Sequence, residues 1–177
     1  MAWSDDVLDF WFGLEPEQYW KANPVLDEAV RSRFLKLWTG KRQDVPQEFL
    51  ANERDALAGV ILFDQMPRNM FRGHADQYST DPLALAIAKG AVDMRLDERM
   101  SPSQRGMLYM PFMHSEDKAE QERSMLLFTA LGDADQLDFA KRHHDVIARF
   151  GRFPHRNVLL GRAPRPDEAA AGDAVPW

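Results

Sequence analysis

Apolar side chains recur every three or four residues along most of the chain, which is the spacing of one face of an α-helix. No segment combines a sustained period of two with an enrichment in β-branched residues, so the pattern predicts no strand. About seven helices joined by short loops favour antiparallel neighbours. We therefore predict an all-α fold class of stacked antiparallel helical hairpins, with residues 1–165 as a single helical domain.

Capping and helix-breaking residues set the limits of these helices. We expect helices from Ser4 to about Phe12, from Asn23-Pro24 to Gly40, from Pro46 to about Met66, from Asp81-Pro82 onward, from the capping box Ser101–Gln104 to a stop or kink at Pro111, from about Lys118 to Gly132, and from about Gln136 to Gly151. The third helix should end before Pro67. A short helical turn is expected at 156–160. Residues 166–177 are predicted to form a loose C-terminal tail unless Trp177 is docked.

Two carboxylates, Glu53 and Asp64, interrupt the apolar stripe of the helix expected from Pro46. They lie roughly 16 Å apart along the helix axis, too far for a carboxylate pair acting on one bond. A carboxylate that faces a core needs a cationic partner or a proton. We therefore predict that Asp64 is buried beside an arginine, for which the candidates are Arg68, Arg72, Arg149 and Arg152. In the alternative interpretation, the two carboxylates line a polar cavity between helices.

Histidines supply the candidates for acid–base chemistry. His143 lies near the middle of the apolar arc of its helix, where a histidine is either hydrogen-bonded in the core or a general base. Pro111 makes the chain leave its helix, so that His114, Ser115 and Glu116 can point in different directions. No base and oxyanion donor can be placed around Ser115, so no catalytic triad is predicted. The catalytic candidates are His114, Glu116 and His143.

The composition narrows the class of partner. The net charge of −6 argues against nonspecific nucleic-acid binding. The chain has no cysteine, which fits a reducing compartment, and no apolar run of about 20 residues for a membrane span. Acids at the N-terminus stand where a signal peptide has basic residues, so we expect a cytoplasmic protein. Nothing in the spacing of the histidines requires a metal, and no motif calls for a cofactor.

One segment departs from the acidic balance. Between Asp145 and Asp167 the chain has no acid, and this stretch contains Arg149, Arg152, Arg156, Arg162 and Arg165 together with His155. These cations either pair with acids elsewhere on the chain or hold an anion. The candidate ligand-binding residues are Asp64, Arg68, Asn69, Arg152, His155, Arg156 and Asn157.

Four strings of residues resemble the uncharacterised bacterial family catalogued as domain of unknown function 924. The strings are Leu8–Phe12, Asp64–Gly73, Tyr109–Glu116 and Arg149–Asn157, and the match extends from about residue 4 to residue 165. The resemblance implies an all-helical, tetratricopeptide-like fold, a right-handed α-α superhelix, and brings no established activity. His143 looks like the family's histidine ahead of Arg-Phe-Gly, whereas His144 stands where an arginine is usual.

Three functional hypotheses follow. The first is a binding module whose polar Arg/His pocket takes a small anionic ligand or an acidic peptide end. The second is a helical scaffold that recruits protein partners, and the third is a small, hydrolase-like acid/base enzyme using His114, Glu116 or His143. Under the first hypothesis His114, Glu116, Arg152, His155 and Arg156 meet Arg68 and Asn69 around one pocket. The chain could be a monomer or a homodimer.

Overall fold

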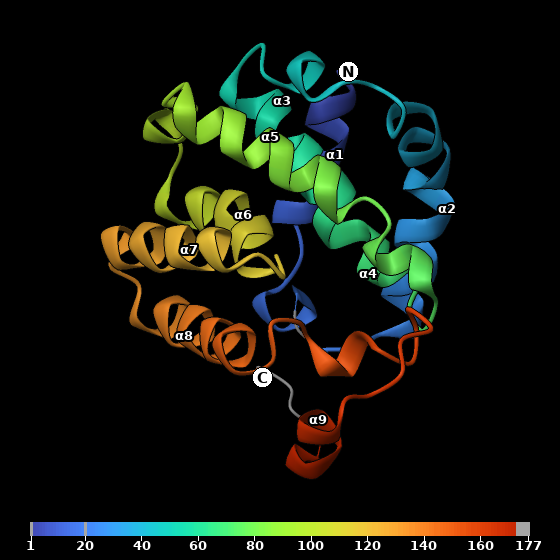
Figure 1. The fold of residues 1–177 in the computed structure, drawn as a ribbon. Coiled ribbons are helices and arrows are strands. Elements are labelled where there is room, and N and C mark those ends of the chain that lie inside the picture. The colour runs from blue at the N-terminus through green and yellow to red at the C-terminus, as the bar shows by residue number, and fades with distance from the viewer. Residues whose placement is uncertain (1, 20, 173–177) are drawn as a thin grey trace. The chain divides into compact units, whose positions relative to one another are not determined.

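The computed structural model describes residues 2–19 and 21–172, and every regular element within them is helical (Figure 1). The all-α prediction is confirmed. The α-helices are α1 (Trp3–Phe12), α2 (Pro24–Lys41), α3 (Glu53–Val60), α4 (Met66–Met70), α5 (Asp81–Asp93), α6 (Pro102–Met113), α7 (Lys118–Leu131), α8 (Ala134–Phe150) and α9 (Pro166–Ala171). Short 3₁₀ turns lie at Pro16–Tyr19, Pro46–Phe49, Ala75–Tyr78, Leu96–Arg99 and Pro154–Arg156.

The chain divides into two compact units, residues 1–108 and 109–177, and this boundary falls within α6. The single domain expected over residues 1–165 and the right-handed superhelical stacking of its hairpins stay predictions. In the described ranges, no helix is both long enough and apolar enough to cross a membrane.

Several helix ends follow the sequence signals. The Asn23 side chain caps α2 by accepting hydrogen bonds from the backbone N–H groups of Val25 and Leu26, at 3.0 and 3.3 Å. The capping box of α6 forms as expected, because Ser101 N–H donates to the Gln104 side chain at 2.9 Å and Gln104 N–H donates to the Ser101 hydroxyl at 3.4 Å. At the ends of α7 and α8, Gly132 and Gly151 adopt φ angles of 78° and 68°, which favour glycine.

The first helix begins two residues earlier than a cap at Ser4 predicts. The Ala2 carbonyl accepts the Asp6 N–H, so α1 starts at Trp3 and no side chain caps it. Ser4 therefore lies within the first turn and is buried. The prediction that Ser4 caps this helix is wrong because Trp3 already adopts the helical conformation.

The helix expected from Pro46 to Met66 is wrong at both ends. Pro46–Phe49 form a separate 3₁₀ turn, and α3 begins only at Glu53, where the Asn52 side chain accepts the Asp55 N–H at 2.9 Å. Glu53 is thus a first-turn residue with a 31% exposed side chain, 3.6 Å from Arg99, and not a core carboxylate.

At its other end the helix continues through Pro67 by changing its winding. Residues 61–65 form a π-helical turn in which the Met66 N–H reaches back five residues to the Ile61 carbonyl. Pro67 has no N–H for the Phe63 carbonyl, but the Thr80 hydroxyl donates to that carbonyl at 2.7 Å. The freed carbonyl therefore has a partner, and α4 extends to Met70.

The core of the first unit forms where α3 packs against both α1 and α5, while α2 packs against α4. Its fully buried side chains include Phe34, Phe49, Phe63, Met66 and Ile87. The packing of α2 on α4 brings the first turns of α2 next to the end of α4 (Figure 1).

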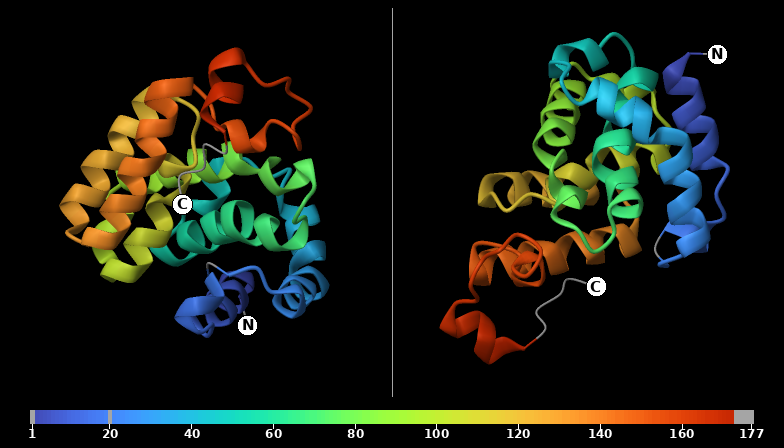
Figure 2. Two further views of the ribbon diagram at one scale, coloured as in Figure 1. Left: turned by 90° about the horizontal axis from the view of Figure 1, so that it is seen from below. Right: turned by 90° about the vertical axis from the view of Figure 1, so that its right-hand side faces the viewer.

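In the second unit, α7 and α8 form an antiparallel hairpin, and they lie side by side in every view (Figure 2). Beyond them, Pro166–Ala171 form α9, within the segment predicted to be a loose tail. Glu168 of α9 is buried and paired with Arg152, and this ion pair supplies the ordering that the composition of the tail does not indicate. Trp177, the expected docking residue, lies outside the described residues.

Candidate functional site

Asp64 occupies the π-helical turn of the first unit and is completely buried. Its carboxylate lies 3.4 Å from the Arg68 guanidinium and accepts a hydrogen bond of 2.5 Å from the side chain of Gln65. The prediction that Asp64 is buried beside an arginine is confirmed, and Arg68 is the partner. A π-helical turn inside an α-helix often marks a functional position, but here its carboxylate is engaged by neighbouring side chains.

Arg68 links Asp64 to the start of α5. Its two terminal nitrogens each donate to one oxygen of the Asp81 carboxylate at 3.1 Å, and it also donates to the Asp64 backbone carbonyl. Burial favours the neutral guanidine, but the carboxylates of Asp64 and Asp81 raise the pKa of Arg68. Arg68 therefore joins α4 to α5, and its hydrogen bonds serve the fold.

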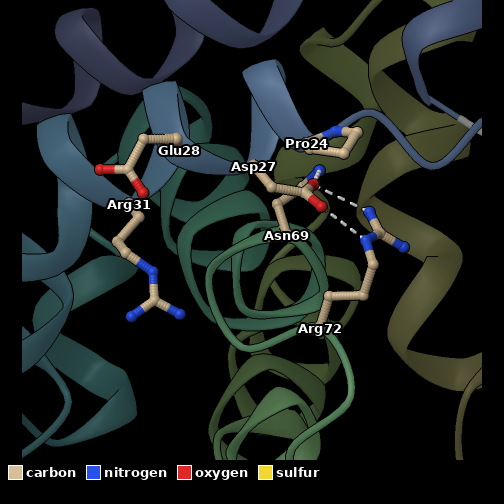
Figure 3. A pocket seen from close by; sticks show the side chains of 6 residues that line it. All are labelled: Pro24, Asp27, Glu28, Arg31, Asn69 and Arg72. Carbon is tan, nitrogen blue, oxygen red and sulfur yellow. Dashed lines mark hydrogen bonds and ion pairs between the residues drawn. The ribbon is translucent and has the colours of Figure 1, made fainter.

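An open hollow of about 370 Å³ lies where α2 meets the end of α4 (Figure 3). In this hollow, Asn69 of α4 and Arg72, which follows α4, face Asp27 of α2. Asn69 donates to the Asp27 carboxylate at 2.8 Å, and Arg72 donates to both of its oxygens at 2.6 and 2.9 Å. Burial would raise the pKa of Asp27, but the hydrogen bonds from Arg72 and Asn69 lower it. The hollow is lined by Pro24, Asp27, Glu28, Arg31, Asn69 and Arg72.

Arg31 is a cationic residue of this hollow that forms no ion pair with a described acid. Its guanidinium donates to the Met70 carbonyl and lies 5.7 Å from the centre of the Phe71 ring. Among the described residues, no carboxylate lies within salt-bridge distance of it. In Figure 3 the Arg31 side chain points away from Glu28. The hollow thus contains a guanidinium that is held in place and that no described carboxylate pairs with.

In the second unit, Glu116 is engaged by the segment that follows α8. Arg162 binds its two oxygens at 2.7 and 3.0 Å, and the Phe153 N–H donates to it at 2.7 Å. Burial would raise the pKa of Glu116, but the hydrogen bonds from Arg162 and Phe153 lower it. Glu116 is therefore ionised at neutral pH and acts as a hydrogen-bond acceptor in a loop-to-loop joint.

Arg152 and Asn157 form a second joint in the same unit. Arg152 donates to both oxygens of Glu168 at 2.5 and 2.8 Å, and Asn157 donates to one of them at 2.9 Å. These hydrogen bonds, first of all that from Arg152, lower the pKa of Glu168 to about 2. Two cations of the acid-poor segment, Arg152 and Arg162, thus find acids within the same unit of the chain.

The histidine candidates gather around Phe153. The His143 ring lies 5.6 Å from the Phe153 ring and 5.9 Å from the His114 ring, and the His155 ring also lies 5.6 Å from the Phe153 ring. The Arg156 guanidinium lies 4.5 Å from the Phe153 ring centre and donates to the His114 carbonyl at 3.0 Å. Of the residues predicted to meet around one pocket, Arg156 contacts the His114 carbonyl, and His155 and Arg156 both lie beside the Phe153 ring.

His143 is poorly suited to take up a proton. Its Nδ1 donates to the Phe139 carbonyl at 2.7 Å, since a carbonyl can only accept. Burial, with the nearby charges of His114 and Arg156, lowers the pKa of His143 to about 3, although the Phe139 hydrogen bond acts in the opposite direction. A general base works best with a pKa near the operating pH, so this arrangement favours a structural imidazole.

The single pocket predicted for all these residues spans both units, because Arg68 and Asn69 belong to the first and His114 and Arg156 to the second. It stays a prediction. Within the part of the chain that the structure describes, no three His, Asp or Glu side chains are placed to hold a metal ion.

Sequence reasoning missed Asp27, Arg31, Asp81, Arg162 and Glu168 as members of these clusters. Asp27 and Arg31 are polar residues on the outer part of an amphipathic helix, where charged residues are ordinary. Glu168 falls in a stretch that reads as a tail. The one available signal was the acid-poor run 146–166, which requires acids from elsewhere in the chain.

Comparisons with known proteins agree with the helical architecture. A family model described as "Bacterial protein of unknown function (DUF924)" matches residues 7–171. A solved structure of a protein of unknown function, ATU0120 from Agrobacterium tumefaciens, is similar at 36% sequence identity and a TM-score of 0.89, over 95% of each chain. No curated protein matches the chain.

Proposed function

The chain belongs to the DUF924 family of bacterial proteins of unknown function, and we propose that it is a binding module that holds a small anionic ligand in the hollow between α2 and α4. The observation that supports this proposal is Arg31, a guanidinium held at the hollow without an acidic partner among the described residues. Asp27 already neutralises the charge of the neighbouring Arg72, so an anion in the hollow would form its strongest ion pair with Arg31.

A fixed guanidinium suits this task for two physical reasons. It offers N–H groups in a planar fork that matches a carboxylate or a phosphate, and such charge-assisted hydrogen bonds are among the stronger ones. The contacts with the Met70 carbonyl and the Phe71 ring restrict the side chain before a ligand arrives, which reduces the entropy lost on binding. A volume of about 370 Å³ is at the lower end of the range for small-molecule sites.

The acid/base alternative receives less support from the geometry. Glu116 is ionised and bound by Arg162, and His143 is neutral with Nδ1 committed to a backbone carbonyl. Neither group is positioned with a free proton to give or a basic site of suitable pKa. Both instead connect elements of the second unit.

A scaffold for protein partners is the second candidate, and it is favoured by the outer face of the α7–α8 hairpin. Leu126 on α7 is 72% exposed and Phe139 on α8 is 42% exposed. The two residues lie on neighbouring helices of the hairpin. Exposed apolar side chains on a hairpin are the kind of group that a protein partner would cover.

The anion proposal is tested by thermal unfolding in phosphate, with sodium chloride of equal ionic strength as the reference. Phosphate that binds only the folded state should raise the Tm. At a phosphate concentration of one hundred times the Kd, the free energy of unfolding should increase by about 2.7 kcal/mol. Arg31→Gln should remove this increase. Lys36→Gln is the matched control, because Lys36 is an exposed cation on the same helix but not part of the hollow. An equal increase in Arg31→Gln, or none in the wild type, would contradict the proposal.

A further inference from the structure

We propose that the second unit contains a binding site for an acidic peptide segment of a partner protein, and that the chain's own residues 163–168 occupy this site and compete with the partner. The site belongs to the second unit, whereas the hollow between α2 and α4 belongs to the first. Three observations support the proposal: the donors that meet at Glu168, the way in which residues 163–168 are held, and the small contribution of α9 to the core.

Hydrogen bonds from the rest of the second unit meet at the Glu168 carboxylate. Arg152 donates to its two oxygens at 2.5 and 2.8 Å, and Asn157 donates to one of them at 2.9 Å. A guanidinium that binds both oxygens of one carboxylate has the geometry by which arginine recognises carboxylates. Both donors thus face a single acidic group, and another carboxylate in its place would form the same hydrogen bonds.

Polar groups also hold the residues that precede Glu168. The Ala163 carbonyl accepts a hydrogen bond of 2.8 Å from Arg152, so one guanidinium binds both a main-chain carbonyl and the Glu168 carboxylate. The Arg165 side chain donates to the Phe150 carbonyl, at the end of α8, at 2.9 Å. Residues 163–168 are therefore bound through a main-chain carbonyl, a basic side chain and, three residues later, an acidic side chain. A competing peptide needs the same groups, which the pattern Arg-x-x-Glu supplies.

The helix that carries Glu168 contributes little else to the fold. In both views of Figure 2, α9 lies outside the α7–α8 hairpin. Within α9, all of which the structure describes, Glu168 is the only buried residue, and Ala169 and Ala170 are exposed. A helix of six residues is also too short to be stable by itself. The position of α9 therefore depends on polar contacts, and a peptide with the same polar groups can replace them.

Contacts that do not involve α9 keep Asn157 in position. Its side-chain oxygen accepts a hydrogen bond of 3.0 Å from Arg162, and Glu116 binds Arg162 through both carboxylate oxygens. Because this oxygen faces Arg162, the NH₂ group of Asn157 faces Glu168. Departure of α9 would leave this buried NH₂ group without its acceptor, which is unfavourable. An incoming carboxylate removes that cost, so binding of the partner and release of α9 are coupled.

The test uses a fluorescein-labelled, end-blocked peptide with the sequence of residues 163–172, and fluorescence anisotropy measures its binding to the full chain. Glu168→Gln removes the charge of the internal segment. This variant should bind the peptide with a Kd at least about tenfold lower than that of the wild type, in which the tethered segment competes at a high effective concentration. Asp167→Asn, at the neighbouring exposed acid, is the matched control and should bind like the wild type.

Two further arms test whether Arg152 recognises the carboxylate. A peptide that itself carries Glu168→Gln should not bind to the Glu168→Gln protein. The double variant Arg152→Gln/Glu168→Gln removes both partners of the internal pair and so leaves no buried charge unpaired, and it should lose binding of the unmodified peptide. Equal Kd values in either comparison would overturn the proposal, because the carboxylate would then not be what the site recognises.

The comparison with the wild type decides whether the internal segment competes. No binding to Glu168→Gln, or binding to the wild type as tight as to this variant, would also overturn the proposal. Circular dichroism checks that the variants keep the helices outside α9. If Glu168→Gln loses them, Glu168→Asp replaces it, because aspartate keeps the charge on a shorter side chain that Arg152 and Asn157 reach less well, and the same comparison of Kd values with the wild type applies.

Discussion

His143 should make the second unit sensitive to mild acid. Its pKa is about 3 in the folded protein, compared with 6.5 for an unperturbed histidine, because it is buried near His114, His155 and Arg156. Between these two values the unfolded chain binds a proton at His143 that the folded chain does not. The stability that results is complete above pH 6.5 and is lost as the pH falls toward 3. Lowering the pH from 7 to 5 should therefore cost about 2 kcal/mol at this residue.

The measurement compares urea unfolding of the wild type and His143→Gln at pH 7, 6 and 5. Glutamine keeps an N–H donor for the Phe139 carbonyl but does not titrate, and carboxyl groups contribute equally to both proteins. The wild type should lose about 2 kcal/mol more than the variant over this range, or about 4–8 °C in Tm. Parallel stability profiles, or an NMR titration of folded His143 with a midpoint near 6.5, would refute the reasoning.

Two further predictions concern the internal ion pairs. Asp64→Ala should lower the free energy of unfolding by about 3 kcal/mol, because Arg68 keeps Asp81 but loses its fully buried partner. A loss below about 1 kcal/mol in chemical denaturation would show that the ion pair does not stabilise the fold. Glu168→Gln should release α9 and speed proteolytic cleavage near residues 163–171. Asp167→Asn, at the neighbouring exposed acid, is the control and should be cleaved at the rate of the wild type. Equal cleavage rates of the two variants would contradict this role for Glu168.

The helices were largely predictable because their signals are local. An asparagine cap before Pro24, a Ser-x-x-Gln box at Ser101 and glycines after α7 and α8 act within a few residues of the backbone groups that they satisfy. The passage of the helix through Pro67 was not predictable in this way. It depends on a hydroxyl from Thr80, which supplies the hydrogen bond that proline cannot.

Some residues of the candidate sites also carry a local sequence signal, and others do not. Periodicity alone placed Asp64 in the core, because a carboxylate in the middle of an apolar stripe has little choice of environment. Arg31 and Asp27 carry no such signal, since charged residues on the outer face of a helix are usual. Their contacts arise only when α2 packs on α4 and places Asp27 opposite Asn69 and Arg72.

The polar residues in the segments that resemble the family therefore fall into two groups: some form internal ion pairs, and others line the hollow. Arg68 and Arg152 are bound by acids of their own unit, so substitutions there should report on stability first. Asn69 instead belongs to a hollow whose open charges, Arg31 and Glu28, lie outside those segments on α2. A loss of binding after a change at Arg68 or Arg152 would thus be ambiguous between unfolding and function. Changes at Arg31 and Glu28 alter the charge of the hollow without breaking an ion pair among the described residues, and they are the direct test of the proposed binding.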